Sequence, residues 1–222
     1  MTKRGLLSSD LEIAMSEPAE LTEINAETHV VSAPLAAAVR GALGTRSVVL
    51  VGMMGAGKSS IGRRLGAALD VPFLDADTEI EKAAGMSIPD IFESKGEPYF
   101  RAGEARVIAR ILDGGPQVLA TGGGAFMNEQ TRNVVRERGV SVWLKADLDV
   151  LLKRVKRRAD RPLLKDGDPA VTLQRLMAER DPFYAQADLT IGSRDVPHEA
   201  IVAEIVSMIA SKLSVSLVEV QS

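Results

Sequence analysis

A glycine-rich segment at residues 52–59, GMMGAGKS, carries the clearest chemistry in the sequence. It fits the pattern Gly-x-x-x-x-Gly-Lys-Ser/Thr and lies between a short apolar run and a helical pattern, as a phosphate-binding loop requires. Such a loop points backbone N–H groups at an anion, while Lys58 reaches the β- and γ-phosphates and the Ser59 hydroxyl binds Mg²⁺. The alternative is a strand-to-helix turn with a solvated lysine. The residues expected to contact the nucleotide are Gly55, Ala56, Gly57, Lys58, Ser59 and Ser60.

Two aspartates, Asp75 and Asp77, follow the short apolar run 72–74. Because parallel sheets place ligands at the carboxyl ends of their strands, both carboxylates are expected to face the phosphate loop. One can hold the water shell of Mg²⁺, and the other can accept a hydrogen bond or a proton from a hydroxyl nucleophile. The alternative for Asp77 is that it only caps the helix that follows.

Three consecutive glycines, residues 122–124, follow the apolar run 117–121. A turn without side chains at the end of a strand lets a substrate approach backbone amides closely. Taken alone, the same residues fit an ordinary flexible turn equally well.

The overall composition excludes several other classes of site. With 27 Lys and Arg against 30 Asp and Glu, the net charge of -3 gives no general attraction for nucleic acids or anionic membranes. The chain has no Cys and two His, which excludes disulfides, thiolate zinc sites and cysteine nucleophiles. A metal ion is therefore expected to be a hard cation bound by oxygen. The basic run 153–158 has no interleaved aromatics, so a solvated helix face is favoured over an RNA-binding patch.

Short apolar runs alternate with longer amphipathic segments from Ser47 onward, which predicts a three-layer α/β fold with a parallel sheet. Residues 1–45 are expected to be a flexible N-terminal extension that ends in a short helix at 35–43. No run is long enough for a membrane helix or a signal peptide, so a cytoplasmic location is expected. The predicted strands are 47–52, 72–74, 117–121, 140–144 and 189–191. The predicted helices are 58–69, 77–84, 88–93, 97–112, 129–138, 148–158, 170–184 and 198–213.

Six motifs together resemble one known family, the shikimate kinases. They are the loop 52–59, LDAD at 74–77, GEPYFRAGE at 96–104, GGG at 122–124, RPLL at 161–164 and ERDPFY at 179–184. Each of the shorter motifs is weak alone, but six in this order are specific. The resemblance covers about residues 47–213. It implies a P-loop kinase fold with a five-stranded parallel sheet and a mobile lid at about 153–168, inside a domain at 46–213 that is followed by a tail at 214–222.

The resemblance also implies an activity, the ATP-dependent phosphorylation of the 3-hydroxyl of shikimate on the route to chorismate and the aromatic amino acids. It assigns Lys58 and Ser59 to ATP and Mg²⁺, and Asp75 to Mg²⁺ through water. It assigns Asp77 to the shikimate hydroxyls and to the role of candidate base. Arg101, Gly123 and Arg180 would bind shikimate, Glu104 would orient Arg101, and Arg161 would reach the ATP phosphates. A guanidinium fork matches a carboxylate in shape and charge, which agrees with this division of roles.

Several alternatives stay open at this point. A kinase for gluconate would meet the same carboxylate and hydroxyl chemistry, and a nucleoside monophosphate kinase would share the phosphate loop. A non-catalytic nucleotide-binding regulator, with residues 1–33 as its interaction arm, fits badly with the presence of Lys58, Asp75, Asp77 and Arg161. No long apolar strand ends in the aspartate that many phosphate-loop proteins use for Mg²⁺, so Asp75 takes that place. We expect a monomer, since nothing in the sequence requires more.

Overall fold

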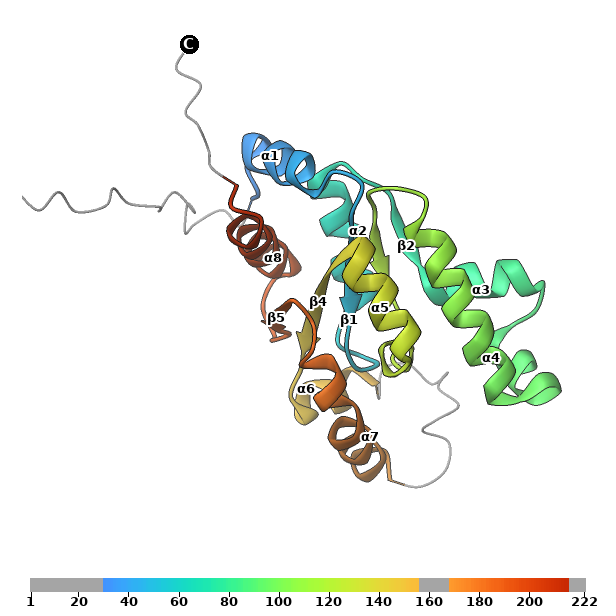
Figure 1. Ribbon diagram of the computed structural model, residues 1–222. Coiled ribbons are helices and arrows are strands. Elements are labelled where there is room, and N and C mark those ends of the chain that lie inside the picture. Colours follow the sequence, from blue (N-terminus) through green and yellow to red (C-terminus); the bar gives the residue numbers. More distant parts are fainter. Residues whose placement is uncertain (1–29, 156–167, 216–222) are drawn as a thin grey trace, which may run out of the picture.

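A computed structural model describes residues 30–155 and 168–215 of the chain (Figure 1). In these residues five parallel strands form one sheet in the order β2-β3-β1-β4-β5. Each strand begins and ends within one residue of its predicted position, so the predicted sheet is confirmed. The strands are β1 (Ser47–Val51), β2 (Phe73–Asp75), β3 (Val118–Ala120), β4 (Gly139–Lys145) and β5 (Leu189–Gly192).

Helices cover both faces of the sheet, which gives the predicted three layers (Figure 1). Right-handed crossovers place the helix after β1 on one face and the helices after β2 and β3 on the other. Accordingly α1, α2 and α8 pack on one another, and α4 packs on α5. The helices are α1 (Ala33–Leu43), α2 (Lys58–Leu69), α3 (Ala76–Ala84), α4 (Ile88–Leu112), α5 (Glu129–Arg138), α6 (Leu148–Val155), α7 (Pro169–Tyr184) and α8 (His198–Lys212), with a short 3₁₀ helix η1 (Ala125–Met127).

The central strand β1 is buried at every position, as a strand covered on both faces must be. It pairs with β3 on one side and β4 on the other. The functional segments predicted from the sequence therefore follow three adjacent strands, β1, β2 and β3, and all leave the sheet at its carboxyl edge.

Helix α4 contains a sharp break at Gly96, which has φ 81° and ψ 167°. This backbone conformation is accessible to glycine and costly for other residues, and Pro98 follows closely. The predicted separation into helices 88–93 and 97–112 is thus confirmed as a kink within one element. The second part of α4 begins after this kink and carries Arg101 and Glu104 in its first turns.

Helix α1 packs on the domain, although it lies within the range 1–45 that we expected to be a flexible extension. Ser32 caps its first turn, and Val39 and Leu43 are buried in the hydrophobic core against α2 and α8. The expected helix at 35–43 is therefore present, and the packed part of the described chain begins before residue 46. The remaining expected extension, residues 1–29, lies outside the described residues.

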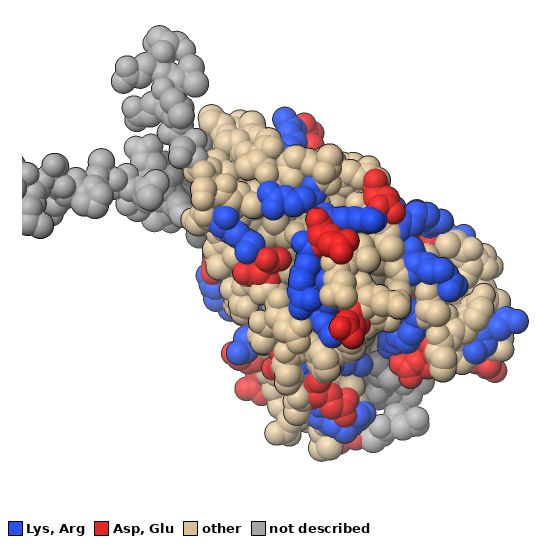
Figure 2. Space-filling model, viewed as in Figure 1, with Lys and Arg blue, Asp and Glu red and all other residues tan. Residues whose placement is uncertain are grey.

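Three further features bear on the expectations above. The tip of the predicted lid, including Arg161, lies outside the described residues. Among the helices that are described, none has the length and apolar character needed to cross a membrane. On the face drawn in Figure 2, Lys and Arg are interspersed with Asp and Glu. This face therefore lacks the continuous stripe of positive charge that is typical of nucleic-acid-binding proteins.

Candidate active site

The phosphate loop connects β1 to α2 and leaves the N-terminus of α2 uncapped by any side chain. Its last glycine, Gly57, has φ 94°, a left-handed conformation that lets the loop turn directly into the helix. The Lys58 ammonium donates to the carbonyl oxygens of Gly52 at 2.8 Å and Met53 at 3.0 Å. The lysine thus lies across the loop, with its charge beside the amides that an anion would meet.

Two residues that the sequence analysis did not single out brace the far side of this loop. Ser193, just after β5, donates to the Ala56 carbonyl at 2.7 Å. Arg154, on α6, donates to Ser193 Oγ at 2.8 Å and lies 3.4 Å from the Gly55 carbonyl. We interpreted the basic run containing Arg154 as a solvated helix face. Helical spacing places Arg154 next to the apolar residues Leu151 and Val155, which are buried in the structure. This spacing is the one feature of the sequence that indicated a packed position for Arg154.

Asp75 joins β2 to the phosphate loop. Its Oδ2 accepts a 2.6 Å hydrogen bond from the Ser59 hydroxyl, and its Oδ1 accepts one from the backbone N–H of Asp77 at 3.2 Å. The residue that caps α3 is therefore Asp75, and the alternative in which Asp77 is the cap is wrong. The structure brings Ser59 and Asp75 together, as the sequence analysis expected for two residues that serve one cation.

The Asp77 side chain lies in the first turn of α3 and reaches solvent, as a substrate site requires. The protein around it nevertheless removes enough water to raise the pKa of its carboxyl. The negative charge of Asp75 raises this pKa further, while the positive charges of Lys58 and Arg101 oppose the increase. Asp77 is thus electrostatically linked to both the phosphate loop and the arginine of α4.

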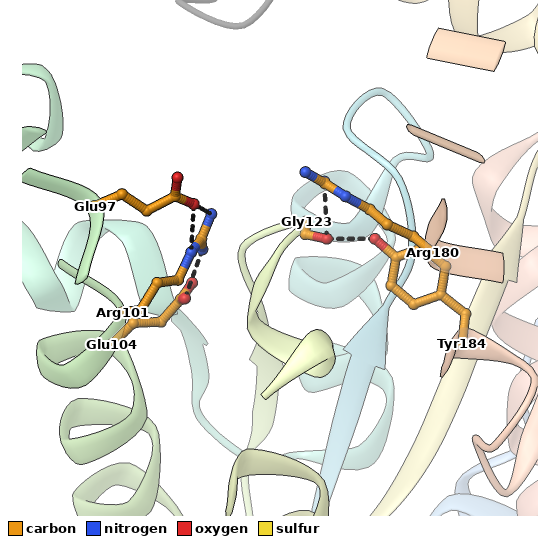
Figure 3. A network of polar contacts seen from close by, with 6 residues as sticks. All are labelled: Glu97, Arg101, Glu104, Gly123, Arg180 and Tyr184. Carbon is orange, nitrogen blue, oxygen red and sulfur yellow. Dashed lines mark hydrogen bonds and ion pairs between the residues drawn. The ribbon is translucent and has the colours of Figure 1, made fainter. Parts of the chain in front are cut away.

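Arg101 is held by two glutamates of its own helix (Figure 3). Its Nη1 donates to Glu104 at 2.7 Å, and its Nε and Nη2 donate to Glu97 at 3.1 and 3.0 Å. Glu104 is only 2% exposed, and burial raises the pKa of its carboxyl although Arg101 opposes the increase. Its second oxygen, Oε1, has no hydrogen-bond partner within the described residues. The structure therefore contains a contact through which Glu104 can hold Arg101 in place.

Arg180, on α7, faces Arg101 from the opposite side of the triple-glycine turn (Figure 3). Its Nη1 donates to the Gly123 carbonyl at 3.1 Å, and the hydroxyl of Tyr184 donates to the same oxygen. Tyr184 is fully buried, and burial raises the pKa of its phenol to about 12. In the sequence analysis Tyr184 was named only as part of the motif ERDPFY at 179–184, without a role of its own.

The triple-glycine turn leaves no room for side chains. A Cβ atom on Gly122 would lie 2.8 Å from Glu104 Oε1 and 2.9 Å from Asp77 Oδ1. On Gly123 it would lie 3.3 Å from Arg180 Nη1, and on Gly124 within 2.7 Å of the Arg101 guanidinium. None of the three glycines has a positive φ, so the turn requires glycine for space. The predicted site residues Asp77, Arg101 and Arg180 therefore lie directly against this turn.

Buried Arg132, on α5, holds the continuation of this turn. Its Nη1 donates to the carbonyls of Phe126 at 2.9 Å and Met127 at 2.8 Å in η1, and its guanidinium lies 5.0 Å from the centre of the Phe183 ring. Because Phe183 neighbours Tyr184 in α7, Arg132 connects three elements of the site. Nothing in the sequence distinguishes it from the exposed arginines of the same helix.

The described part of the site thus contains a phosphate loop, a serine and an aspartate beside it, a second aspartate, and two arginines around a glycine turn. Arg161, predicted to reach the phosphates, lies outside the described residues. In a five-stranded parallel sheet of order 2-3-1-4-5, this set defines a P-loop kinase that acts on a small anionic acceptor.

Comparisons with known proteins narrow this class. The family model for shikimate kinase matches residues 54–210. The shikimate kinase of Rhodopseudomonas palustris is 67% identical over 174 residues, which cover 78% of this chain and 86% of that protein. The corresponding protein of Bradyrhizobium diazoefficiens is 64% identical over 175 residues, or 79% and 84% of the two chains. The chain belongs to the shikimate kinase family.

Solved structures agree. A shikimate kinase from Acinetobacter baumannii in complex with shikimate superposes with a TM-score of 0.74 at 36% identity, covering 78% of this chain and 98% of that one. A gluconokinase from Sinorhizobium meliloti superposes with a TM-score of 0.52 at 21% identity, which shows a shared fold only. The resemblance stated from the six sequence motifs is confirmed.

Proposed function

We propose that the chain carries out the reaction of its family at the site described above. It transfers the γ-phosphoryl group of ATP to the 3-hydroxyl of shikimate and releases shikimate 3-phosphate and ADP. The observation that carries this proposal is the triple-glycine turn. It lies against Asp77, Arg101 and Arg180, and the position of a Cβ on Gly123 is 3.5 Å from the Met54 amide of the phosphate loop. This closeness supports an acceptor site at the turn, next to the proposed nucleotide site.

The phosphate loop would bind ATP through its amides and Lys58. The contacting residues in this proposal are Gly55, Ala56, Gly57, Lys58, Ser59 and Ser60. Phosphoryl transfer requires little covalent help from the enzyme, so neutralising the charge on the phosphates is the main task of these groups. Arg161 is proposed to add a further positive charge to them from the lid.

Mg²⁺ fits the pair formed by Ser59 and Asp75. A hydroxyl and a carboxylate oxygen, 2.6 Å apart, are ligand types that Mg²⁺ prefers, directly or through water. No cluster of three or more His, Asp and Glu is present in the described residues, which suits an ion that keeps water and phosphate oxygens as its other ligands. When held there, the ion would supply positive charge that offsets the negative charge on the phosphates of ATP.

Asp77 is proposed to orient the shikimate 3-hydroxyl and to accept its proton as the bond to phosphorus forms. A raised pKa suits this task, because a carboxylate with a higher pKa is a stronger acceptor. The positive charges of Lys58 and Arg101 favour the ionised form of Asp77 and offset part of the increase in its pKa that burial causes. The side chain can thus bind the hydroxyl before transfer and hold its proton afterwards.

Arg101 and Arg180 are proposed to bind the shikimate carboxylate. They approach the glycine turn from opposite sides, and each presents guanidinium N–H groups at its edge (Figure 3). Glu104 holds Arg101 in place by a 2.7 Å hydrogen bond between charged groups. Because the arginine is already ordered, less conformational entropy is lost when the carboxylate binds. The acceptor would therefore be held at its carboxylate, with Asp77 placed to meet a hydroxyl.

The proposal includes a monomer in the cytoplasm that binds small molecules and no nucleic acid. The large exposed apolar residues of the described ranges lie in separate segments of the chain, so they suggest no large apolar interface: Val30, Met86, Tyr99, Val171 and Val196. Light scattering during gel filtration should give a mass near 23.7 kDa. A mass twice as large would contradict the proposed monomer and would leave the proposed reaction unaffected.

A coupled assay of ADP release with Mg·ATP tests the reaction. The acceptors compared are none, shikimate, gluconate, AMP and CMP. Release that depends on shikimate supports the proposal, and slow release without any acceptor is expected because water competes in an open site. ADP release with gluconate, AMP or CMP but not with shikimate would show that the acceptor is a different molecule. Binding of ATP without release for any acceptor would favour a non-catalytic regulator.

A further inference from the structure

The carbonyl oxygen of Gly123 accepts two hydrogen bonds, and both donors come from α7. One is Arg180 Nη1 at 3.1 Å, and the other is the hydroxyl of Tyr184 (Figure 3). The two donors are four residues apart, so they lie on the same face of the helix. A carbonyl oxygen has two lone pairs, so both bonds can be made at once.

Arg180 has to serve two acceptors if it binds a substrate carboxylate. In the structure its Nη1 is committed to a backbone carbonyl of the partly buried glycine turn. Turning the guanidinium toward a carboxylate weakens or removes that bond. If Arg180 were the only donor, the Gly123 carbonyl would lose its partner, and an unpaired polar group away from water opposes binding.

We propose that Tyr184 is a positioning residue for the acceptor; this inference rests on the proposed function. Tyr184 keeps the Gly123 carbonyl hydrogen-bonded, so Arg180 is free to bind the carboxylate of the acceptor. The tyrosine acts through Arg180 and through the glycine turn, and it does not touch the substrate. Its effect is therefore expected in the capture of the acceptor, while the binding of ATP and the rate of phosphoryl transfer change little.

The surroundings of Tyr184 suit this task. The residue is 0% exposed, its ring lies 5.9 Å from the ring of Trp143 on β4, and its hydroxyl lies 4.0 Å from the Met53 sulfur of the phosphate loop. A side chain packed in this way cannot follow Arg180 when the arginine moves. Burial also raises the pKa of the phenol to about 12, so the hydroxyl keeps its proton and can donate at neutral pH.

A double-mutant cycle on kcat/KM for shikimate tests the proposal. Tyr184→Phe removes the hydroxyl and keeps the ring, and Arg180→Ala removes the other donor. We expect Tyr184→Phe to lower kcat/KM for shikimate by roughly tenfold, equivalent to about 1.4 kcal/mol, through KM. Its kcat and its KM for ATP should stay within about threefold of wild type. In the Arg180→Ala background the same change should have no further effect on kcat/KM.

Tyr99→Phe is the matched control, because Tyr99 is the only other tyrosine of the chain and is 54% exposed. It should behave as wild type. Equal effects of Tyr184→Phe in both backgrounds would mean that the hydroxyl only stabilises the fold, and an unchanged KM in the single variant would mean that it does not act at all. Either result overturns the inference. Wild-type protein that releases no ADP with shikimate would instead overturn the proposed function, so the two failures are distinguishable.

Discussion

The hydroxyl of Ser59, in the first turn of α2, donates a 2.6 Å hydrogen bond to Asp75 at the end of β2. This contact joins the phosphate loop to the strand that leads into the acceptor site. Asp75 also accepts from the first turn of α3, so one carboxylate fixes the position of Asp77 relative to the loop. The proposed metal site and the proposed base are therefore linked through one carboxylate.

Asp75→Asn should separate the electrostatic role of this residue from its structural one. Asparagine caps helices as well as aspartate does, so α3 should remain intact. The lost charge should raise the Mg²⁺ concentration for half-maximal activity by about tenfold or more. Asp70→Asn is the control, since Asp70 is an exposed aspartate at the opposite end of α2. An unchanged Mg²⁺ titration of Asp75→Asn would remove Asp75 from the metal site.

Asp77→Asn should be less active and more stable than wild type at neutral pH. The folded protein raises the pKa of Asp77 above its ordinary value of 3.8, so folding disfavours the charged form. The native state then binds more protons than the unfolded state, and stability falls as pH rises through 3.8 toward the folded pKa. We expect urea midpoints of the variant to exceed those of wild type at pH 7 and to converge with them below about pH 4. A variant less stable than wild type at pH 7 would contradict the assigned environment of Asp77.

Gly124→Ala should disturb acceptor binding through Arg101. The new methyl group would lie within 2.7 Å of a guanidinium that Glu97 and Glu104 hold in place. We expect KM for shikimate to rise at least tenfold while KM for ATP changes little. The control is Gly41→Ala, where no atom lies within 4 Å of the new methyl group and a helix should gain about 1 kcal/mol. Wild-type kinetics for Gly124→Ala would show that Arg101 is not fixed against this turn.

Glu104→Gln should weaken shikimate binding because Arg101 loses its buried, charged partner. A hydrogen bond between charged groups is worth about 1.5–3 kcal/mol, so calorimetry should show an affinity lower by about 10- to 100-fold. Glu97→Gln changes the other partner, which is 61% exposed, and should alter the affinity by less than about threefold. Equal effects of the two substitutions would argue against a special role for the buried glutamate.

Arg161→Ala should lower kcat by about a thousandfold or more and leave shikimate affinity close to wild type. An arginine that faces the transferred phosphoryl group stabilises the transition state and contacts no acceptor carboxylate. Arg175→Ala is a suitable control, because Arg175 forms an exposed pair with Glu179 on α7. Single-turnover experiments would measure the rate of phosphoryl transfer in Arg161→Ala directly. A rate equal to that of wild type would exclude Arg161 from the chemical step.

Much of the fold was predictable because local patterns determine it. Buried parallel strands are short apolar runs, and each strand was located to within one residue. The phosphate loop is a contiguous motif, and the gap between the predicted helices 88–93 and 97–112 coincides with the kink at Gly96 in α4. The resemblance to a known family then placed Asp77, Arg101, Glu104 and Arg180, whose distances apart in the sequence carry no information by themselves.

The contacts that brace the site could not be predicted in the same way. Ser193 and Ala56 are separated by 137 positions, and Tyr184 and Gly123 by 61, so only the packed tertiary structure brings them together. Arg132 looks like any polar residue of an amphipathic helix until its burial against η1 is known. The lack of side chains on glycines 122–124 was noticed in the sequence, but the protein side chains that lie against them could be identified only in the structure.

The position of the new phosphate ester tests the central claim most directly. Wild-type protein would be incubated with Mg·ATP and shikimate, and the product examined by two-dimensional ¹H–³¹P NMR spectroscopy, with Asp77→Asn as the comparison. We predict one phosphorylated shikimate for each ADP, with phosphorus coupled to the proton on carbon 3, and very little product from the variant. ADP without phosphorylated shikimate, or phosphate on a different hydroxyl, would contradict the proposed arrangement of the acceptor between Arg101, Arg180 and Asp77.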